Sequence, residues 1–396
     1  MATRTLRDLN MKGRRVFVRV DYNVPIADGV VGDDTRIRGT LPTLRYVLDA
    51  GAACVILASH FGRPKGKPNP AMSLRPVAAR LALLLGLPVA FADDCVGEVA
   101  ERAVAQAPPG SIVLLENLRF HAEEEKNDPD FARQLAKLAD VYVNDAFGAA
   151  HRAHASVDAL PRLMPESGAG LLMEDELRYL GSVLEHPERP FVAVLGGAKV
   201  SDKIEVIENL IPRVDRLIIG GAMAYTFLKA AGKPTGRSLV EDDKLAAARD
   251  IVTRAGAAGV ELLLPSDHVV ADKLEAGAAT SVLSVDDPAI GDRMGLDIGP
   301  ATVAAYSRAV ADAKTVLWNG PMGVFEIDEF ARGTMALAAA VANVKGTTIV
   351  GGGDSMAAVH KAGVADRITH ISTGGGASLE FLGGSVLPGV AALPNA

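Results

Sequence analysis

Four apolar segments in the first half of the sequence are each followed directly by polar or cationic side chains. The segments read VFVRVDYN, VILASHFGRP, VLLENLRF and VYVNDAFGAAHR. The residues in them that could bind a ligand are Asp21, Tyr22, Asn23, His60, Phe61, Gly62, Arg63, Arg119 and Arg152, and Arg36 opens the helical stretch after the first segment. Because the arginine fork matches a carboxylate or a phosphate, these loops predict a site for a small, highly charged anion. Solvated turns remain the alternative for Asp21, Asn23 and Arg36 taken alone.

Similar apolar segments in the second half end in glycines: VAVLGGAK, LIIGGAM, TVLWNGPMG, TIVGGGDS and ITHISTGGG. Glycine loops let backbone N–H groups approach the phosphates of a nucleotide. GGGDSMAA (351–358) has the form of a phosphate cradle, in which Asp354 would meet Mg²⁺ or, alternatively, cap a helix. STGGGAS (372–378) would open a second helix, whose N–H groups could stabilise a phosphoryl group in transfer. In WNGPMGVFE, Asn319 and Glu326 add polar groups, and the carboxylate suits ribose hydroxyls.

Lys199 and Lys203 stand four residues apart in GGAKVSDK. Residues with this spacing share a helix face, so both ammonium groups are expected to reach the same phosphates. Lysines at a helix start oppose the helix dipole unless an anion binds there, although a solvated helix face is the alternative. His151 and His154 have no cysteine partners beside them, which favours structural roles over metal binding.

Composition excludes several classes of protein. The chain has 396 residues, 49% hydrophobic and 22% charged, and a net charge of −7. These values fit a globular protein of two domains and argue against nucleic-acid or anionic-membrane partners. Cys54 and Cys95 set no disulfide framework. The start of the chain has no hydrophobic signal region and the longest apolar stretch is short, so a cytoplasmic protein is expected.

The elements that must position these loops alternate between short β-branched runs and helical stretches. Strands are expected near 15–20, 53–59, 111–115, 140–144, 191–195, 215–219, 260–264, 314–318, 346–350 and 368–372. Helices are expected over 75–85, 131–139, 173–184, 243–253 and 333–344. This alternation predicts an α/β fold of parallel sheets with helices on both faces, where ligands bind outside the carboxyl ends of the strands. A change in loop character places a domain boundary around 165–190.

Taken together, the motifs resemble those of the phosphoglycerate kinase family. DYNVP, HFGRP, ENLRF, NDAFGAAHRAHAS, LGGAKVSDKI, GGAMAYTFL, LDIGP, WNGPMGVFE, GGGDS and STGGGASLEFL occur in the family's order. The resemblance implies two Rossmann-like domains, 1–172 and 191–384, joined by a helix and hinge at 173–190, with a tail (385–396) on the first domain. It also implies a monomer that transfers a phosphoryl group between ATP and 3-phosphoglycerate with Mg²⁺. GGS (383–385) departs from the family's charged segment and leaves the local hinge contacts open.

The resemblance also assigns the site residues. The phosphoglycerate site would comprise Asp21, Tyr22, Asn23, Arg36, His60, Phe61, Gly62, Arg63, Arg119 and Arg152. The nucleotide site would comprise Lys203, Gly221, Gly295, Asn319, Glu326, Gly352, Gly353, Asp354 and Ser355, with Asp354 as the Mg²⁺ contact. The groups around the transferred phosphoryl would be Arg36, Lys199, Lys203, Gly374 and Gly375.

Two other classes of protein are the alternatives to this one. A nicotinamide-dependent dehydrogenase would need a dinucleotide fingerprint, which is missing because Met356 stands where the third glycine belongs. A periplasmic-type anion-binding protein would not need the second, glycine-built site. Because the acceptor carboxylate is already ionised at neutral pH, phosphoryl transfer needs no general base. Hinge closure is expected to bring the two ligands together.

Overall fold

The computed structural model describes residues 3–396, which form two compact units. The N-terminal unit comprises Met1–Arg178 and Val386–Ala396, and the C-terminal unit comprises Tyr179–Ser385. The division falls inside helix α7 (Leu171–Glu185), in the region where the sequence predicts a connection between domains. Each unit is described by itself below.

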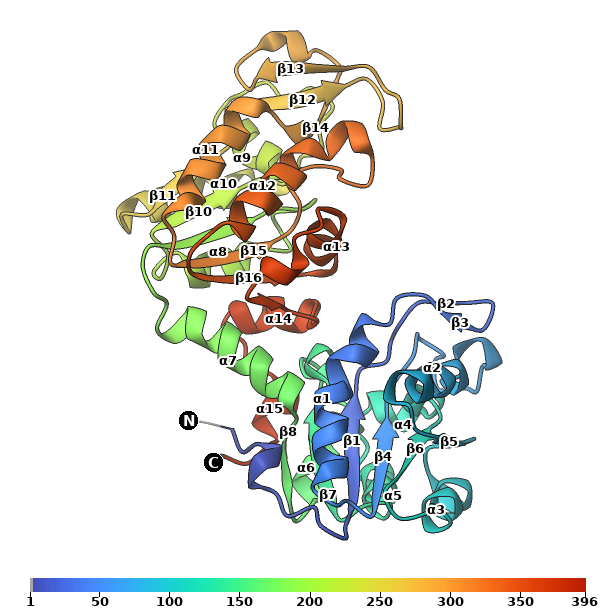
Figure 1. Ribbon diagram of the computed structural model, residues 1–396. Coiled ribbons are helices and arrows are strands. Elements are labelled where there is room, and N and C mark those ends of the chain that lie inside the picture. Colours follow the sequence, from blue (N-terminus) through green and yellow to red (C-terminus); the bar gives the residue numbers. More distant parts are fainter. Residues whose placement is uncertain (1–2) are drawn as a thin grey trace. The chain divides into compact units, whose positions relative to one another are not determined.

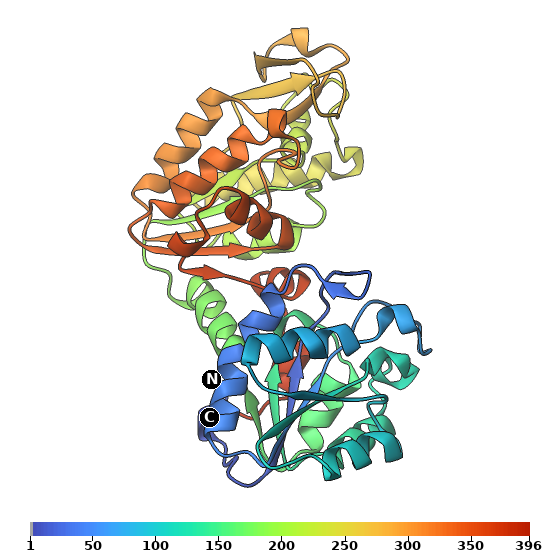
Figure 2. The same ribbon diagram turned by 45° about the vertical axis from the view of Figure 1, so that its right-hand side comes forward.

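The N-terminal unit contains a six-stranded parallel sheet with the order β5-β6-β4-β1-β7-β8. Its strands are β1 (Arg15–Val20), β4 (Cys54–Ala58), β5 (Val89–Ala92), β6 (Ser111–Leu115), β7 (Val141–Asp145) and β8 (Ser167–Ala169), with a separate hairpin of β2 (Ile26–Ala27) and β3 (Val30–Val31). The helices are α1 (Thr35–Asp49), α2 (Arg75–Leu85), α3 (Gly97–Ala105), α4 (Ala122–Glu125), α5 (Pro129–Ala136), α6 (Leu160–Leu163) and α15 (Pro388–Ala391). Figures 1 and 2 show helices on both faces of this sheet.

Burial on both faces explains why the central strands read as continuous apolar runs. Every residue of β4 is buried, and so is β1 apart from its first residue. Ile37, Leu44 and Val47 share one face of α1 and pack into the same core as Val18 of β1. The sheet is therefore fixed from both sides, which holds the loops at its carboxyl edge in place.

The C-terminal residues of the chain return to the N-terminal unit. The Arg4 amide donates to the Pro394 carbonyl at 2.9 Å, and the Gly389 amide donates to the Ala150 carbonyl at 2.9 Å. The Asn144 side chain on β7 donates to the Gly389 carbonyl at 3.0 Å. The tail thus contacts the loop after β7 with its own backbone.

The C-terminal unit contains a second six-stranded parallel sheet, with the order β11-β10-β9-β15-β16-β17. Its strands are β9 (Phe191–Leu195), β10 (Arg216–Ile219), β11 (Glu261–Leu263), β15 (Thr315–Asn319), β16 (Thr347–Gly351) and β17 (His370–Ile371). The helices are α8 (Ile204–Leu210), α9 (Ala224–Ala230), α10 (Leu245–Ala257), α11 (Pro300–Ala311), α12 (Arg332–Ala342), α13 (Gly353–Lys361) and α14 (Gly376–Leu382). These helices also cover both faces (Figures 1 and 2). The predicted α/β fold is confirmed.

One part of the C-terminal unit was not predicted. Strands β12 (Asp267–Ala271), β13 (Thr280–Ser284) and β14 (Met294–Ile298) form an antiparallel sheet, seen at one end of the unit in Figure 1. It is an addition to the predicted parallel sheet. Strand β13 is largely exposed and reads TSVLS, so it lacks the apolar run that marks the buried strands.

The GGS segment ends helix α14 as a glycine cap. The Gly383 amide donates to the Leu379 carbonyl at 2.8 Å, and the Ser385 amide donates to the Glu380 carbonyl at 2.9 Å. Gly384 has a φ of +87°, a conformation that glycine adopts without the strain of a Cβ. The departure from the family's charged segment therefore produces a regular helix end.

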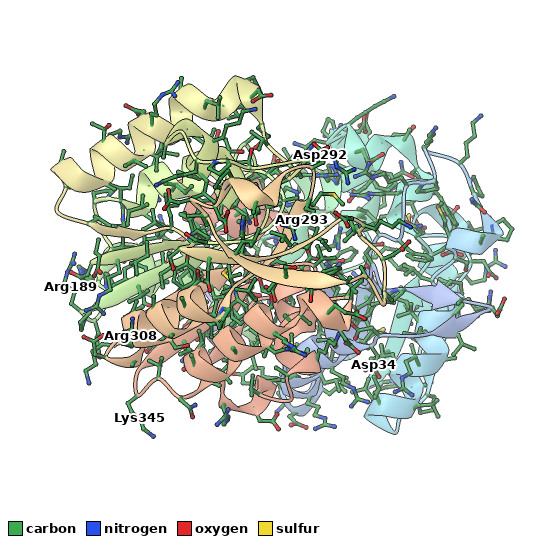
Figure 3. The ribbon with its side chains drawn as sticks, turned by 90° about the horizontal axis from the view of Figure 1, so that it is seen from above. Asp34, Arg189, Asp292, Arg293, Arg308 and Lys345 are labelled. Carbon is green, nitrogen blue, oxygen red and sulfur yellow. The ribbon has the colours of Figure 1, made fainter. Side chains whose placement is uncertain are left out.

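Charged side chains lie on the outside of both units. Figure 3 shows Arg189, Arg308 and Lys345 together on the side of the C-terminal unit where β9 and β16 begin, away from Arg293. Asp34, in the N-terminal unit, precedes α1 and accepts hydrogen bonds from Arg38 and Arg80 at 2.7 and 2.6 Å.

No helix in residues 3–396 combines the length and the apolar character that a membrane crossing requires.

Candidate active site

The four cationic loops of the N-terminal unit leave one edge of one sheet. Strands β6, β4, β1 and β7 are consecutive in the sheet and parallel, so their carboxyl ends meet at that edge. Asp21, His60 and Arg152 follow three of these strands, and Arg119 lies in the short helix after β6. The sequence predicted this grouping, and the strand order confirms it.

Hydrogen bonds join five of the ten predicted residues. Arg36 Nη1 lies 3.1 Å from Asp21 Oδ2 and donates to the Asn23 carbonyl at 3.1 Å. The Gly62 amide donates to Asn23 Oδ1 at 3.0 Å, and Arg119 Nη1 donates to the Gly62 carbonyl at 2.9 Å. The loops after β1, β4 and β6 are therefore linked to one another. This linkage fixes the direction of two arginines before any ligand binds.

Arg19 was not predicted as a site residue, but its buried side chain contacts residues at this edge of the sheet. It is fully buried on β1, donates to Ser156 Oγ at 2.8 Å, and its Nη2 lies 3.2 Å from Nδ1 of His60. Buried Glu124 accepts from the Ser156 hydroxyl at 2.5 Å, and burial raises the pKa of its carboxyl. An arginine inside an apolar strand gave no separate signal, because the VFVRV run reads as core.

The cationic side chains at this edge lie close enough together to repel one another. Burial, and then the charge of Arg19, lowers the pKa of His60 well below its ordinary value. Burial, and then the charge of Arg119, lowers the pKa of His154 to about 4. Both imidazoles are therefore neutral at pH 7, which supports the prediction that His154 is structural. An anion bound here would relieve the repulsion among the arginines.

The remaining predicted residues of this loop set fall into two groups. Arg63 and Arg152 are exposed, and Arg152 Nε donates to His151 at 3.2 Å. Tyr22 is fully buried and its hydroxyl bonds Thr40 Oγ1 at 2.8 Å. Phe61 packs partly buried on the core of the sheet. The aromatic side chains therefore fix the loops in position, whereas the exposed arginines are available to contact a ligand.

In the C-terminal unit, the glycine loops follow β9, β10, β15, β16 and β17. These five strands are parallel and consecutive, so the loops also share one edge. A cavity of about 510 Å³ opens beside them. Four predicted residues line it: Gly221, Gly295, Glu326 and Asp354. A mostly apolar cavity with a few polar groups is the usual form of a small-molecule site.

The predicted pairing of Lys199 with Lys203 on one helix face is wrong. Helix α8 begins only at Ile204, with Lys203 as its N-cap, so Lys199 lies in the preceding loop. Lys199 is exposed, whereas Lys203 is 8% exposed and its Nζ donates to Asn319 Oδ1. Burial lowers the pKa of Lys203 to about 8, against the opposing charges of Asp202 and Asp354. A spacing of four does not separate the two cases, because glycine loops and helix starts look alike in sequence.

The loop after β16 brings several predicted residues around Asn319. Gly352 has a φ of +90°, and a Cβ there would meet Asn319 Nδ2 at 3.2 Å. That Nδ2 is buried and has no hydrogen-bond partner among the described residues. Ser355 Oγ accepts from the Gly320 amide at 2.6 Å. An unused buried donor beside a glycine turn fits an oxygen-rich ligand such as a phosphate.

Asp354 and Gly353 lie exposed at the start of α13. The N-cap of α13 is Gly352 and Asp354 lies in the first turn, so the simple N-cap alternative is not observed. The Asp354 carboxylate is close enough to Lys203 to act on its pKa. A lone exposed carboxylate suits Mg²⁺, which takes one or two protein carboxylates and otherwise waters and substrate phosphates.

The cavity wall contains polar residues that the sequence analysis did not select. The Tyr225 hydroxyl lies 3.0 Å from His268 Nδ1, and His268 Nε2 is buried without a partner among the described residues. A Cβ on Gly295 would lie 1.5 Å from that hydroxyl, so only glycine fits there. Burial raises the pKa of nearby Asp297 to about 7. His268 and Asp297 come from the antiparallel sheet, the element that sequence did not predict.

In the second glycine turn, after β17, a serine side chain of the same segment accepts a hydrogen bond from the backbone. The Gly374 amide donates to Ser372 Oγ at 3.2 Å, and Ser372 Oγ lies 2.7 Å from Ser378 Oγ. Gly375 is the N-cap of α14 with a φ of +54°. No atom lies within 4 Å of where its Cβ would be, so this turn faces open space.

Both units are of the α/β class, with cationic loops at the edge of one sheet and glycine turns at the edge of the other. The family model for phosphoglycerate kinase matches residues 6–385. The chain is 58% identical over 403 residues to phosphoglycerate kinase of Koribacter versatilis, covering 100% of both chains. It is 59% identical over 394 residues to that of Moorella thermoacetica, covering 99% of both. The chain belongs to the phosphoglycerate kinase family, and it is a phosphotransferase with a carboxyl group as acceptor.

Solved structures agree with this assignment. Phosphoglycerate kinase from Coxiella burnetii superposes with a TM-score of 0.90 at 41% identity, covering 98% of each chain. The enzyme from Pyrococcus horikoshii superposes with a TM-score of 0.83 at 33% identity, covering 99% of this chain and 98% of the other. The α/β fold is therefore shared along almost the whole chain.

Proposed function

We propose that the N-terminal edge binds 3-phosphoglycerate, that the C-terminal cavity binds ATP or ADP, and that the phosphoryl group passes directly between them. One observation carries this proposal. The chain has an arginine-rich edge on one sheet and, on the other, a cavity beside glycine turns with a buried lysine. Two anion sites of different construction suit a charged acid and a nucleotide.

On the acceptor side, Arg36, Arg119 and Arg152 would hold the phosphate and carboxylate of the acid, with Asp21 and Asn23 on its hydroxyl. The hydrogen bond from Arg36 to Asp21 holds its guanidinium in place before the acid arrives. The acceptor carboxylate, with a pKa of about 3.5, is ionised at neutral pH and needs no base to attack. The neutral state of His60 and His154 agrees with a site that does no proton transfer.

On the donor side, Lys203 and the turns at Gly352–Ser355 and Gly374–Gly375 would meet the phosphates. Asp354 would hold Mg²⁺, which supplies positive charge to the phosphates of the nucleotide when it is bound. Phosphoryl transfer depends mainly on positioning and on stabilising charge spread over the equatorial oxygens. Arg36 from the acid side, and Lys203 and Lys199 from the nucleotide side, would supply that stabilisation.

The transfer requires that the two bound ligands come together, so we expect hinge closure when both are present. Solution X-ray scattering would measure it. The radius of gyration should fall when both substrates are added and change less with either alone. An unchanged radius with saturating substrates would contradict closure.

We also propose that the protein works as a monomer in the cytoplasm, without nucleic-acid partners. The net charge of −7 supports the last point. The dehydrogenase alternative is not favoured, since the family match covers residues 6–385.

A coupled assay tests the function. The purified chain should form ADP from ATP only when 3-phosphoglycerate and Mg²⁺ are both present, and glycerate without the phosphate should fail as acceptor. ADP formation that is independent of 3-phosphoglycerate would contradict the proposal. A preparation that oxidises a hydroxy acid with a nicotinamide cofactor would restore the dehydrogenase alternative.

A further inference from the structure

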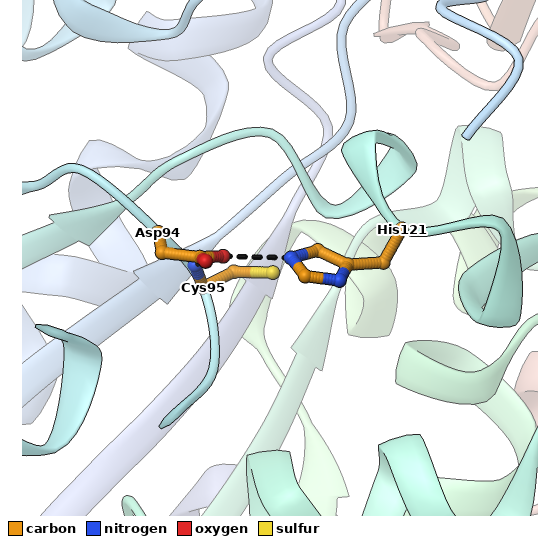
Figure 4. Close-up of side chains that lie close together, drawn as sticks. All are labelled: Asp94, Cys95 and His121. Atoms are coloured by element: carbon orange, nitrogen blue, oxygen red, sulfur yellow. Dashed lines mark hydrogen bonds and ion pairs between the residues drawn. The ribbon is translucent and has the colours of Figure 1, made fainter. Parts of the chain in front are cut away.

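A second cluster of ligand-type side chains lies in the N-terminal unit, apart from the arginine edge. Asp94 and Cys95 follow edge strand β5, and His121 follows the short helix after β6. One oxygen, sulfur or nitrogen atom of each lies within 4.8 Å of the other two. Figure 4 shows the three side chains converging, with His121 Nε2 and Asp94 Oδ1 2.7 Å apart. None of the three belongs to the proposed phosphoglycerate or nucleotide site.

The protein holds these side chains in place. Asp94 Oδ1 also accepts from the Cys95 amide at 2.7 Å, which orients the carboxylate over the thiol. The His121 ring packs against Phe131 with ring centroids 5.3 Å apart. Cys95 is fully buried, while Asp94 and His121 are partly exposed. The cluster is therefore built from fixed positions and not from mobile surface chains.

A cavity gives solutes access to the same point. It has a volume of about 780 Å³, and Asp94 and His121 are part of its wall. Acidic side chains dominate its charged lining: Asp93, Asp94 and Glu116, against a single arginine, Arg75. Arg75 itself is paired with Asp93. The cavity thus favours entry of a cation over that of an anion.

The identities of the three ligands select the kind of cation. Thiolate and imidazole suit borderline or soft metals, whereas Mg²⁺ prefers oxygen ligands alone. Zn²⁺ takes cysteine sulfur at about 2.3 Å and histidine nitrogen or carboxylate oxygen at about 2.0–2.2 Å, in tetrahedral geometry. Ligand atoms within 4.8 Å of one another can reach such a centre with small side-chain shifts. The cavity side leaves a fourth position for water.

We propose that Asp94, Cys95 and His121 form a binding site for a zinc-type divalent cation, separate from the Mg²⁺–nucleotide site. The cation takes the place of the proton in the His121–Asp94 hydrogen bond, which moves to His121 Nδ1 or leaves to solvent, and the Cys95 thiol loses its proton to solvent as the sulfur–metal bond forms. No electron transfer is involved. The bound cation would join the loops after β5 and β6 at the outer edge of the sheet.

Co²⁺ is the probe that tests the site, because a thiolate ligand gives it a sulfur-to-metal charge-transfer band that oxygen ligands do not. The nucleotide-free, metal-stripped, reduced full chain is titrated with Co²⁺ and then with Zn²⁺. We expect one equivalent of Co²⁺ to produce the charge-transfer band together with tetrahedral d–d absorption, and one equivalent of Zn²⁺ to abolish both. Absence of the band at saturating Co²⁺ would overturn the proposal and leave the cluster as a thiol beside an ion pair.

Variants identify the ligands. Cys95→Ser should abolish the band, while Cys54→Ser, at the other buried cysteine, should retain it. If Cys95→Ser fails to fold, His121→Gln and Asp94→Asn serve instead, because both residues are partly exposed. Each should weaken Co²⁺ affinity by more than the roughly 10–100-fold typical of losing an outer-shell partner. A band that survives in His121→Gln with unchanged affinity, or that disappears in Cys54→Ser, would place the metal elsewhere and contradict the assignment.

Discussion

The candidate anion sites of the two units are built in opposite ways. In the N-terminal unit the candidate site is made of side chains: arginines fixed by carboxylates and carbonyls, above a fully buried arginine. In the C-terminal unit it is made mainly of backbone turns around a cavity, with one buried lysine. The first construction concentrates charge, and the second provides space and N–H groups.

The difference appears in the electrostatics. Burial, together with the crowded cations, keeps His60 and His154 neutral, so the N-terminal edge already bears repulsion that an anion would relieve. In the C-terminal unit, burial acts on one cation and lowers the pKa of Lys203 to about 8. Charge is therefore held by a network of arginines at one edge and by a single buried lysine at the other. Substitutions should therefore have different consequences in the two units.

The largest effect should come from Arg36, the arginine of the N-terminal edge that we place on the transferred group. Arg36→Ala should lower kcat by at least about 100-fold, since removing one preorganised contact to a transition state typically costs about 3–4 kcal/mol. Arg38→Ala is the matched control, because Arg38 lies on the same helix but bonds Asp34. Steady-state kinetics on both variants, with circular dichroism to verify folding, make the test. Near-wild-type turnover in folded Arg36→Ala would remove Arg36 from the transfer step.

Substituting Lys203 should lower kcat as much as substituting Arg36. Lys203 should also make the activity depend on pH, which the arginine does not. Lys203→Ala should lose at least about 100-fold in kcat while remaining folded. In the wild type, kcat/KM should fall as pH rises through about 8, because the charged ammonium is the useful form and its pKa in the free enzyme is lowered to about 8. In Lys203→Arg, whatever activity remains should show no such limb, since a guanidinium stays charged. An identical alkaline limb in Lys203→Arg would assign it to another group.

Much of the fold and of the N-terminal edge could be predicted from the sequence. The runs that became β1 and β6 were located to the residue, and helix α2 spans the predicted 75–85. The two strands are buried on both faces, so their apolar composition alone marks them. Arg119 stands out because a cation close after a buried strand is unusual, and Arg36 because it lies at the start of a helical stretch.

What could not be predicted depends on contacts between distant segments. The His268–Tyr225 pair joins α9 to the antiparallel sheet, whose outer strand carries no apolar pattern. The different burial of Lys199 and Lys203 depends on where α8 begins, and a glycine-rich loop does not specify that point. The assignment of roles to individual residues came from the family resemblance and stays a prediction.

A smaller effect should appear in the acid stability of the N-terminal unit. The pKa of His154 is about 4 in the fold, against about 6.5 for a free histidine, so the unfolded chain takes up the proton first as pH falls. Stability from this residue is complete above pH 6.5 and is lost toward pH 4, by about 2 kcal/mol at pH 5. His154→Gln should therefore lose less stability than the wild type between pH 7 and pH 5 in urea unfolding. Exposed His186→Gln is the control, and equal losses in wild type and His154→Gln would contradict the neutral imidazole.

The smallest effect is expected at the wall of the cavity in the C-terminal unit, the candidate site that is made mainly of backbone turns. In Tyr225→Phe the hydroxyl that holds His268 Nδ1 is lost, which should cost about 1 kcal/mol of stability and let the imidazole turn. We expect the KM for ATP to rise a few-fold, with the KM for 3-phosphoglycerate unchanged, because His268 lines only the nucleotide cavity. Tyr306→Phe is matched to it, since that buried hydroxyl donates to the Ile219 carbonyl at 2.6 Å in the core of the same unit. It should lose similar stability with both KM values unchanged. If both variants raise the KM for ATP equally, general loosening of the unit explains the effect, and the wall around His268 has no special part in holding the nucleotide.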